Sequence, residues 1–285
     1  MADPVIVSGE FRTTAHPKSV MYETPGILKR LEYAEVDGNA VFEGDIILAT
    51  AEEAARAQVH ETLRSLAQQP LETMGLPKAL VDALVEFGKQ PLRAVFVTEH
   101  RWKDGVIPFV IDPGLPKPER VREAMKHWET ETQMRIRFRE RQPGDQNFVR
   151  FVAGEGCSSA VGCRGGEQRV ILGPACTAGN AIHEIGHTVG LWHEQSREDR
   201  DQFIEIDLSN VLPGTEHNFR QHVADGDDVG AYDFGSIMHY PLDAFARNPA
   251  QATIRPKKPV PAGVEIGQRK ALSKGDIAAV KQMYP

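Results

Sequence analysis

The residues with the clearest capacity for chemistry lie between positions 181 and 194, in the run Ala-Ile-His-Glu-Ile-Gly-His-Thr-Val-Gly-Leu-Trp-His-Glu. His183 and His187 are four residues apart, so on a helix their imidazole rings project from one face and can bind a single cation. Glu184 points about 100° further round the helix, where its carboxylate can take a proton from a water held at that cation. This spacing predicts a metal site that carries its own catalytic base.

Gly190 and His193 complete the pattern. Glycine adopts at little cost the left-handed conformation that ends helices, so the chain can turn at Gly190 and bring His193 in as a third ligand. Three neutral nitrogens with a fourth position open are typical of catalytic zinc, because structural zinc sites fill all four positions with protein ligands. The alternative is a core helix that happens to contain histidines. We prefer the zinc site, since His-Glu-x-x-His-x-x-Gly-x-x-His fixes five positions in eleven.

This pattern is the extended zinc-binding signature of the metzincin metallopeptidases. The residue after the third histidine is Glu194, and with the following Gln195–Asp201 it makes the chain resemble the astacin family. Residues 236–240, Ser-Ile-Met-His-Tyr, are similar to the astacin Met-turn. The resemblance implies that Met238 forms a hydrophobic floor under the metal and that Tyr240 is a further, displaceable metal ligand. From composition alone, Met238 would be an ordinary core residue and Tyr240 a surface residue.

The resemblance also implies an α+β fold of the metzincin type. Its catalytic domain is expected to have a twisted, mostly parallel sheet carrying an antiparallel edge strand, a zinc helix and a Met-turn. An inhibitory propeptide is expected to precede it. The expected division places the propeptide at residues 1–93 and the astacin-like catalytic domain at residues 94–285, and Arg101–Pro108 resembles the start of mature astacins.

The junction between these two parts is expected at Arg93–Ala94, about where astacin propeptides are removed. A cut after Arg93 by a trypsin-like protease would free the amino group of Ala94. The resemblance implies that this amino group then inserts near Glu194. An activating protease is thus an expected partner of the chain, together with protein or peptide substrates.

Residues 40–48, Ala-Val-Phe-Glu-Gly-Asp-Ile-Ile-Leu, place strand-like residues on either side of Gly44 and Asp45, a dipeptide typical of a tight bend. Taken alone, this stretch is a hairpin turn with an exposed aspartate. It also resembles the Phe-x-Gly-Asp motif of astacin propeptides, which implies that Asp45 binds the zinc, takes the place of the attacking water and keeps the enzyme latent. A carboxylate oxygen is a suitable zinc ligand. A cysteine switch is excluded in residues 1–93, because they contain no cysteine.

The three cysteines, Cys157, Cys163 and Cys176, lie close together in the sequence. Their spacings match none of the common patterns of zinc-binding cysteines. The resemblance implies a disulfide between Cys157 and Cys176, ahead of the zinc helix, and a pairing of Cys157 with Cys163 is the alternative. The odd number of cysteines leaves both an oxidising and a reducing compartment open.

Hydrophobic periodicity predicts helices over residues 51–68, 78–87 and 117–131, and Ser273 with Asp276 predicts the capped start of a last helix over residues 273–284. Strands are predicted at residues 135–138, 148–152 and 169–172. By resemblance, residues 169–172 are the edge strand along the active-site cleft, to which a peptide can add as an antiparallel strand. His60, on the first helix, is predicted to be solvated.

Composition narrows the classes of function. The 285 residues are 41% hydrophobic and 26% charged, as in soluble globular proteins, with a net charge of −7 that argues against a nucleic-acid partner. No apolar run approaches the roughly 18 residues of a membrane span. The first residues lack the basic stretch and apolar run of a secretory signal, whereas the resemblance implies a secreted protein. We expect a monomer.

The sequence therefore predicts a zinc-dependent endopeptidase, present as a latent zymogen in which Asp45 blocks the zinc. Glu184 is the expected base and Tyr240 the expected partner of the developing oxyanion. Arg269 lies near the region that in astacins shapes the pocket for the residue after the cleaved bond, and many astacins favour acidic residues there; the alternative is a surface arginine. The alternative function is a catalytically inactive zinc-binding protein that retains the scaffold.

Overall fold

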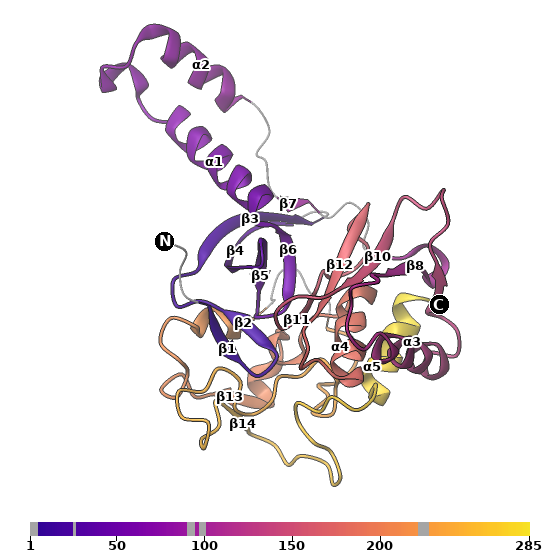
Figure 1. The fold of residues 1–285 in the computed structure, drawn as a ribbon. Helices are drawn as coiled ribbons and strands as arrows, with labels where there is room; N and C mark the ends of the chain where they lie inside the picture. The colour runs from indigo at the N-terminus through magenta and orange to yellow at the C-terminus, as the bar shows by residue number, and fades with distance from the viewer. Residues whose placement is uncertain (1–4, 25–26, 90–94, 97–100, 222–227) are drawn as a thin grey trace.

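The computed structural model of the chain describes residues 5–24, 27–89, 95–96, 101–221 and 228–285. We refer to residues 5–89 as the N-terminal segment and to residues 101–285 as the C-terminal part. One ten-stranded sheet runs through both (Figure 1). In spatial order its strands are β7 (Val95–Phe96), β3 (Lys18–Thr24), β4 (Ile27–Val36), β5 (Asn39–Phe42), β6 (Ile46–Thr50), β11 (Cys157–Ser159), β12 (Glu167–Leu172), β10 (Phe148–Val152), β8 (Val106–Ile111) and β9 (Arg137–Glu140).

In the C-terminal part the sheet is mainly parallel. Strands β12, β10, β8 and β9 pair in parallel, and apolar side chains from this half of the sheet form one core with helices α3 (Glu119–Glu131) and α4 (Ala178–Val189). Within that core the indole of Trp128 on α3 donates to the carbonyl of Ile182 on α4 at 2.9 Å. The helix that carries the His-Glu-x-x-His run is therefore fixed against both the sheet and α3. The strand predicted at residues 148–152 is confirmed, and the one predicted at 135–138 begins two residues later.

The prediction of residues 169–172 as the edge strand is wrong. These residues belong to β12, which lies inside the sheet between β10 and β11. The antiparallel strand is β11, in which Cys157 lies opposite Leu172, and its outer side pairs in parallel with β6 through Ser159 and Ile46. The sequence missed β11 because its three residues, Cys-Ser-Ser, show no alternation of apolar and polar side chains. In this chain the N-terminal segment covers the outer side of β11.

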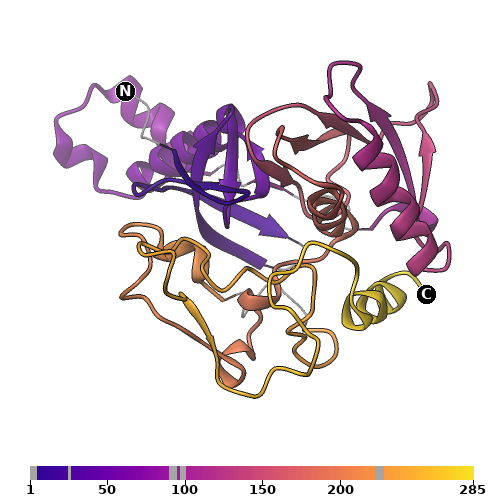
Figure 2. The same cartoon turned by 60° about the horizontal axis from the view of Figure 1, so that its bottom comes forward.

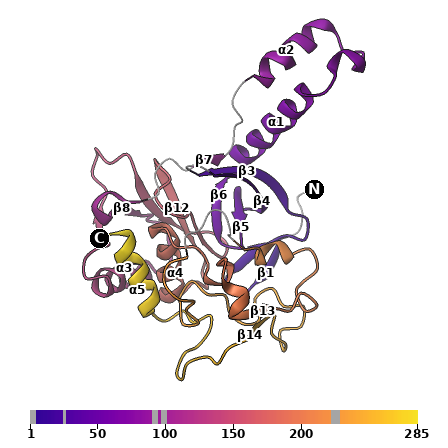
Figure 3. The same ribbon diagram turned by 180° about the vertical axis from the view of Figure 1, so that it is seen from behind.

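The N-terminal segment is an antiparallel meander of β3 to β6 followed by a helical hairpin. Helices α1 (Ala51–Ala67) and α2 (Lys78–Gly88) pack on each other and project from the body of the molecule (Figures 1 and 3). The prediction of a solvated His60 is wrong: its side chain is buried, with its ring 4.6 Å from that of Phe87 on α2. The periodicity of the sequence places His60 on α1, but it does not show that α2 packs against this face of α1 and buries the ring.

A short hairpin of β1 (Ile6–Ser8) and β2 (Phe11–Thr13) precedes the meander. The amide of Arg12 donates to the carbonyl of Gly44 at 2.8 Å, so this hairpin lies against the turn between β5 and β6. That turn contains Asp45. The β1–β2 hairpin and the turn that carries Asp45 are therefore neighbours in the N-terminal segment.

A disulfide joins Cys157 to Cys176, which confirms the pairing implied by the resemblance. It closes the loop from β11 through β12 to the residues just before α4. The third cysteine, Cys163, is buried in the same core and takes no part in this bond. The disulfide ties the start of the histidine helix to the sheet.

After α4 the chain is mostly loops, which form a layer drawn orange to yellow in Figure 2. This region holds the pair of strands β13 (Ile204–Ile206) and β14 (Ile254–Pro256) and the last helix, α5 (Lys274–Met283). Ser273 caps α5 in a capping box with Asp276, as predicted. Short 3₁₀ turns occur along the chain at Leu71–Met74, Lys103–Gly105, Glu194–Ser196, Arg200–Gln202 and Glu216–Phe219. Among the described residues, no helix has the length and apolar character needed to cross a membrane.

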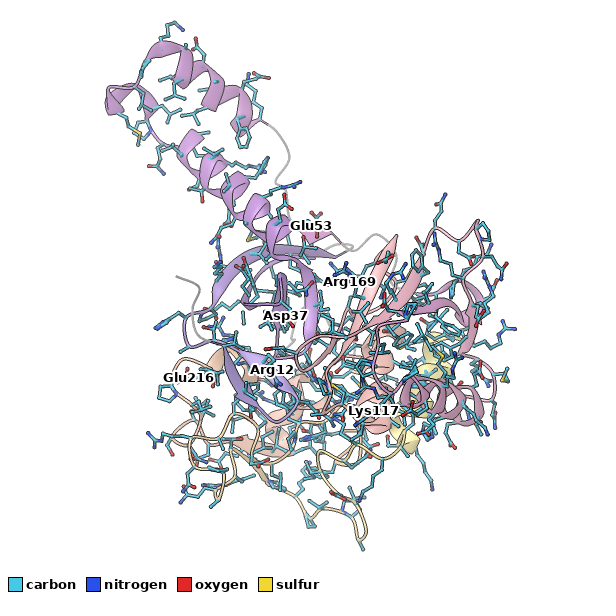
Figure 4. All side chains as sticks on the ribbon, in the orientation of Figure 1. Arg12, Asp37, Glu53, Lys117, Arg169 and Glu216 are labelled. Carbon is cyan, nitrogen blue, oxygen red and sulfur yellow. A yellow bond between two sulfur atoms is a disulfide. The ribbon has the colours of Figure 1, made fainter. Side chains whose placement is uncertain are left out.

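A groove of about 720 Å³ lies where the N-terminal segment meets the C-terminal part. Figure 4 labels three residues of its walls, Asp37, Glu53 and Arg169. The guanidinium of Arg164 reaches across and donates to the carbonyls of Ile47 and Leu48 in β6. This half-buried arginine therefore attaches β6 to the C-terminal part beside the bridge to β11.

Candidate metal centre and active site

Three histidines meet at the end of α4. Thr177 caps the start of the helix through a capping box with Asn180, and Gly190, whose φ is 123°, follows its last residue. His183 and His187 lie on one face with ring centroids 4.8 Å apart. After the turn at Gly190, the ring of His193 comes within 4.7 Å of that of His187. Because few non-glycine residues tolerate this φ, Gly190 permits the change of direction that brings the third histidine into the cluster.

Asp45 faces all three rings. Its carboxylate lies 3.1 Å from Nε2 of His183, 3.2 Å from Nε2 of His193 and 3.7 Å from Nε2 of His187. One ligand atom from each of the four residues lies within 4.8 Å of the others, and all four side chains are buried. The exposed aspartate of a simple hairpin turn is therefore excluded.

The second nitrogen of each imidazole is held by another group. Nδ1 of His183 lies 2.7 Å from the carbonyl of Ile237, and Nδ1 of His187 lies 2.8 Å from the carbonyl of Leu191. Nδ1 of His193 lies 2.7 Å from a carboxylate oxygen of Glu43. Such partners fix the tautomer that leaves Nε2 free for a metal. All three Nε2 atoms then point toward the same place.

The cluster fits a zinc ion on the chemistry of its donors. Three imidazole nitrogens and one carboxylate oxygen are common zinc ligands. Among the described residues, Oδ1 of Asp45 and Nε2 of His187 are buried and have no hydrogen-bond partner. Buried polar atoms without a partner are costly, and a cation at the centre of the cluster would give both atoms one.

Electrostatics support this assignment for two of the histidines. Burial lowers the pKa of His183 and of His187, which favours the neutral imidazole that binds metals. Burial also acts against a charge on His193, but the carboxylates of Asp45 and Glu43 outweigh it and raise its pKa to about 9. Burial alone would raise the pKa of Asp45, and the histidines around it lower that pKa well below its usual range.

Glu184 lies beside the cluster with an unengaged carboxylate. Its side chain is buried, and neither carboxylate oxygen has a hydrogen-bond partner among the described residues. Burial raises the pKa of Glu184 well above its usual range, and the charges of Asp45 and Glu10 add to that effect. A carboxyl group in this environment is suited to accept and return a proton.

Met238 and Tyr240 both lie close to this centre. A Cβ added at Gly186 of α4 would lie 2.5 Å from Sδ of Met238, so the methionine packs directly against the helix where only glycine leaves room. The hydroxyl of Tyr240 is buried and donates to the carbonyl of Glu43 at 2.5 Å. Its ring packs on that of Phe11, with centroids 4.6 Å apart. In this state the N-terminal segment holds the Tyr240 hydroxyl, and Tyr240 is not the surface residue that composition suggested.

Glu194, the residue after the third histidine, lines a small cavity. It accepts a hydrogen bond from the amide of Asp233 at 2.7 Å, and burial raises its pKa to about 8 although Arg197 lies 3.6 Å away. The cavity measures about 40 Å³ and is also lined by Leu191 and Met238. The expected cleavage site at Arg93 and Ala94 lies outside the described residues.

Arg269 is not a surface arginine. Its Nε donates to a carboxylate oxygen of Glu10 at 2.7 Å, and its Nη1 donates to the carbonyls of Ile237 and His239. The other oxygen of Glu10 accepts from the side-chain amide of Asn180, at the start of α4. Arg269 and Asn180 of the C-terminal part therefore bind the carboxylate of Glu10, from the N-terminal segment, beside the histidine helix.

Sequence reasoning missed Glu10, Phe11 and Glu43. Glu43 occupies the variable position of the Phe-x-Gly-Asp motif, so the motif gave no role to its side chain. A charged residue flanked by Phe42 and Gly44 in an apolar stretch was an available signal. Glu10 and Phe11 follow the glycine of a short hairpin turn. Most such turns have no functional role, so nothing in the sequence singled these residues out.

A His-Glu-x-x-His helix, a third histidine after a glycine turn and a methionine packed against the helix together define the site of a metzincin-type peptidase. Comparison with known sequences agrees, because residues 95–285 match the peptidase family described as Astacin. The chain therefore belongs to the astacin family.

Individual relatives support this membership. The chain is 40% identical over 235 residues to "Bone morphogenetic protein 1 homolog" of Strongylocentrotus purpuratus, an alignment that covers 78% of this chain and 36% of that protein. It is 39% identical over 204 residues to "Zinc metalloproteinase nas-39" of Caenorhabditis elegans, covering 69% of this chain and 22% of that protein. The chain thus spans about a third or less of the length of these relatives.

A solved structure is also similar. "High choriolytic enzyme 1 (HCE-1), a hatching enzyme zinc-protease from Oryzias latipes" superposes with a TM-score of 0.59 and 33% sequence identity. The match covers 65% of this chain and 94% of that one. Its coverage of nearly the whole hatching enzyme shows that one peptidase domain fits within the chain.

Removal of zinc is expected to destabilise the full chain. A ligand that binds only the folded state at 1,000 times its Kd stabilises it by about 4 kcal/mol, so a strong chelator should lower the thermal midpoint, and added zinc should restore it. His187→Gln should abolish this response, whereas His16→Gln, at an exposed histidine, should retain it. A melting curve indifferent to chelator, with no zinc found by elemental analysis, would contradict the assignment.

Proposed function

We propose that the chain is a zinc-dependent endopeptidase in a latent form, with the N-terminal segment as its propeptide. The observation that carries this proposal is the position of Asp45 among three histidine nitrogens, next to the unpaired carboxylate of Glu184. His183, His187 and His193 would hold the ion in both forms, and Asp45 would be the fourth ligand in the latent form. Protein or peptide substrates, a monomeric state and an extracellular location are part of the same proposal.

Glu184 would be the proton carrier of the reaction. A bound zinc ion supplies Lewis acidity, which lowers the pKa of water toward 7 and polarises the scissile carbonyl. Glu184 would take the proton from the attacking water and return it to the leaving amine. Its buried carboxylate has no competing hydrogen bond among the described residues, so it is available for both transfers.

Tyr240 would stabilise the developing oxyanion once the N-terminal segment has left. In the latent chain its hydroxyl donates to the carbonyl of Glu43. When the segment departs, the carbonyl of Glu43 would leave with it, and the hydroxyl would be free to donate to the oxyanion. A donor aimed at a transition state contributes about 3 kcal/mol.

The N-terminal segment would block the site at two levels. Asp45 would take the place of the attacking water, and β6 pairs with β11, whose outer side a substrate strand would otherwise use. Strand β6 runs parallel to β11, whereas a substrate is expected to run antiparallel to the cleft edge. The reversed direction would keep the segment's own peptide bonds out of the reactive orientation.

Activation would require a rearrangement at the start of the catalytic domain. Val95 and Phe96 form β7, which pairs with β3 of the N-terminal segment. A cut after Arg93 would leave these two residues in the catalytic chain, so they would have to leave β3 when the segment departs. The cavity beside Glu194 would then receive the new amino group.

The pocket beside Arg269 would accept an acidic side chain of the substrate. In the latent chain the carboxylate of Glu10 fills this place, bound by Arg269 and Asn180. Charge-assisted hydrogen bonds to a guanidinium are among the strongest in proteins. A free pocket would therefore favour a glutamate or aspartate next to the cleaved bond.

Glu184→Gln is expected to abolish turnover while zinc stays bound, because glutamine keeps the shape of the side chain and cannot carry the proton. Loss of a general base costs about 100- to 10,000-fold in rate. Casein cleavage after limited trypsin treatment and zinc content would be measured together, with Glu198→Gln, at an exposed glutamate, as the control. Activity retained in Glu184→Gln would remove this residue from the role of base.

Asp45→Ala is expected to give casein cleavage without trypsin, since it removes the ligand that blocks the site. The wild-type chain should hold zinc both before and after trypsin but cleave casein only afterwards. Asp82→Ala changes an exposed aspartate on α2 and should leave latency intact. Zinc without activity in every form, before and after trypsin, would instead favour the inactive zinc-binding protein.

Arg269→Lys and Arg269→Gln test the acidic pocket in the trypsin-treated enzyme. Peptides that differ only by glutamate or glutamine after the cleaved bond should be separated by about 10- to 100-fold in kcat/KM for the wild type, the worth of one charge-assisted hydrogen bond. Lysine should retain part of the preference, and glutamine should lose it. Equal cleavage of both peptides by the wild type would show that the pocket does not select acids.

A further inference from the structure

Glu43 has an unusual backbone conformation at the metal centre. It lies in the tight turn between β5 and β6, where the amide of Asp45 donates to the carbonyl of Phe42. Its φ is 47° and that of Gly44 is 79°, so two successive residues adopt left-handed conformations. A residue with a side chain takes this conformation at a cost and keeps it where its surroundings determine it. At this turn, the surroundings are the histidine cluster.

Both carboxylate oxygens of Glu43 and its carbonyl oxygen contact residues at the histidine cluster. One carboxylate oxygen lies 2.7 Å from Nδ1 of His193, and the other accepts from the hydroxyl of Ser196 at 2.8 Å. Its carbonyl accepts from Tyr240. The side chain is fully buried. These contacts are specific to a carboxylate, because both of its oxygens accept.

His193 differs from the other two histidines in the origin of its Nδ1 partner. His183 and His187 use carbonyls of Ile237 and Leu191, which belong to the C-terminal part. His193 uses a carboxylate that belongs to the N-terminal segment. Departure of that segment would therefore leave the partners of two histidines in place and remove the partner of the third.

We propose that Glu43 is a positioning residue that orients His193 toward the zinc ion and so couples zinc binding to closure of the N-terminal segment. The inference rests on the proposed function, because it requires zinc at the three histidines. A carboxylate that accepts from Nδ1 fixes the ring orientation and strengthens Nε2 as a ligand. Asp45 acts on the ion directly, whereas Glu43 acts on it through His193.

The balance of buried charges is a second reason to expect that zinc binding and closure of the N-terminal segment are coupled. Glu43 and Asp45 are both fully buried carboxylates of the N-terminal segment. Buried charges are costly unless they are paired, and two carboxylates match the charge of one divalent cation. The closed segment and the ion should therefore stabilise each other, and this coupling must be reciprocal.

Another glutamate of the N-terminal segment provides a matched control. Glu32 on β4 forms an ion pair with Arg220 of the C-terminal part at 2.5 Å. Like Glu43, it joins the two parts of the chain through its carboxylate. Glu32→Gln should remove this ion pair without changing the partner of His193, and an exposed ion pair contributes at most about 1 kcal/mol, so the segment should stay closed.

Zinc affinity of the full chain would be measured by competition with a chromophoric chelator for the wild type, Glu43→Gln, Glu43→Ala and Glu32→Gln. Loss of a partner of a metal-binding histidine typically weakens metal affinity by about 10- to 100-fold, and we expect this loss in Glu43→Ala. Glu43→Gln should lose less, because its amide oxygen still accepts from Nδ1. Glu32→Gln should bind zinc as the wild type does.

A second measurement separates positioning from general stability. In chains labelled with ¹⁵N-histidine, the Nδ1–H proton of His193 should give a protected downfield signal in the wild type and in Glu32→Gln. That signal should be shifted in Glu43→Gln and absent in Glu43→Ala. Urea unfolding of each variant would show that it folds.

The outcomes are distinguishable. Failure of the wild type to bind zinc would refute the proposed function itself. Zinc bound by the wild type and equally tightly by folded Glu43→Ala would overturn the role of Glu43 and leave the peptidase proposal standing. Equal weakening in Glu32→Gln and Glu43→Gln would also overturn it, since the effect would then come from a looser segment.

Discussion

Three imidazole rings and the carboxylate of Asp45 converge on one buried point, and most of the structure depends on that convergence. Ionisable groups are costly to bury unless they are paired or bind a metal. A zinc ion at this point would turn a set of costly burials into a stabilising contact between distant parts of the chain. Helix α4 would supply two of its ligands, the turn at Gly190 would bring in the third, and the turn after β5 would supply the fourth. The core around Trp128 and the disulfide keep α4 where these turns can reach it.

The second constraint is the outer side of β11, which only the N-terminal segment covers among the described residues. A strand with exposed amides and carbonyls pairs readily with any extended chain, which makes it suitable for a substrate and also for an inhibitor built into the same chain. Here β6 pairs with it, and the amide of Ser159 donates to the carbonyl of Asp45 at 2.9 Å. The residue that faces the histidines is therefore also held by the sheet. Backbone pairing sets the register, and this register directs the Asp45 carboxylate to the metal centre.

The sequence contained enough to locate the histidines, their helix and the turn at Asp45, because each depends on local spacing. The helix cap at Ser273 follows from the same kind of local pattern. The sequence did not reveal β11 as the antiparallel strand, the buried position of His60 or the contacts of Glu10 and Glu43. Those features arise where segments far apart in the sequence meet, and their residue types are common on exposed surfaces. A glutamate is usually solvated, so only the fold distinguishes the buried Glu43 and the half-buried Glu10 at this site.

The distribution of contacts explains how the proposed cut in the chain would open the site. Asp45, Glu43, Glu10 and Phe11 all hold the N-terminal segment in place, and while the chain is intact each contact forms within one molecule. A tether of this kind gives a high effective concentration, so even modest contacts remain closed. Cutting the connection leaves the contacts unchanged but lets the segment diffuse away once it opens, after which dilution opposes its return. Latency would therefore depend on the intact connection as much as on the aspartate, and contacts strong enough to survive the cut would defeat activation.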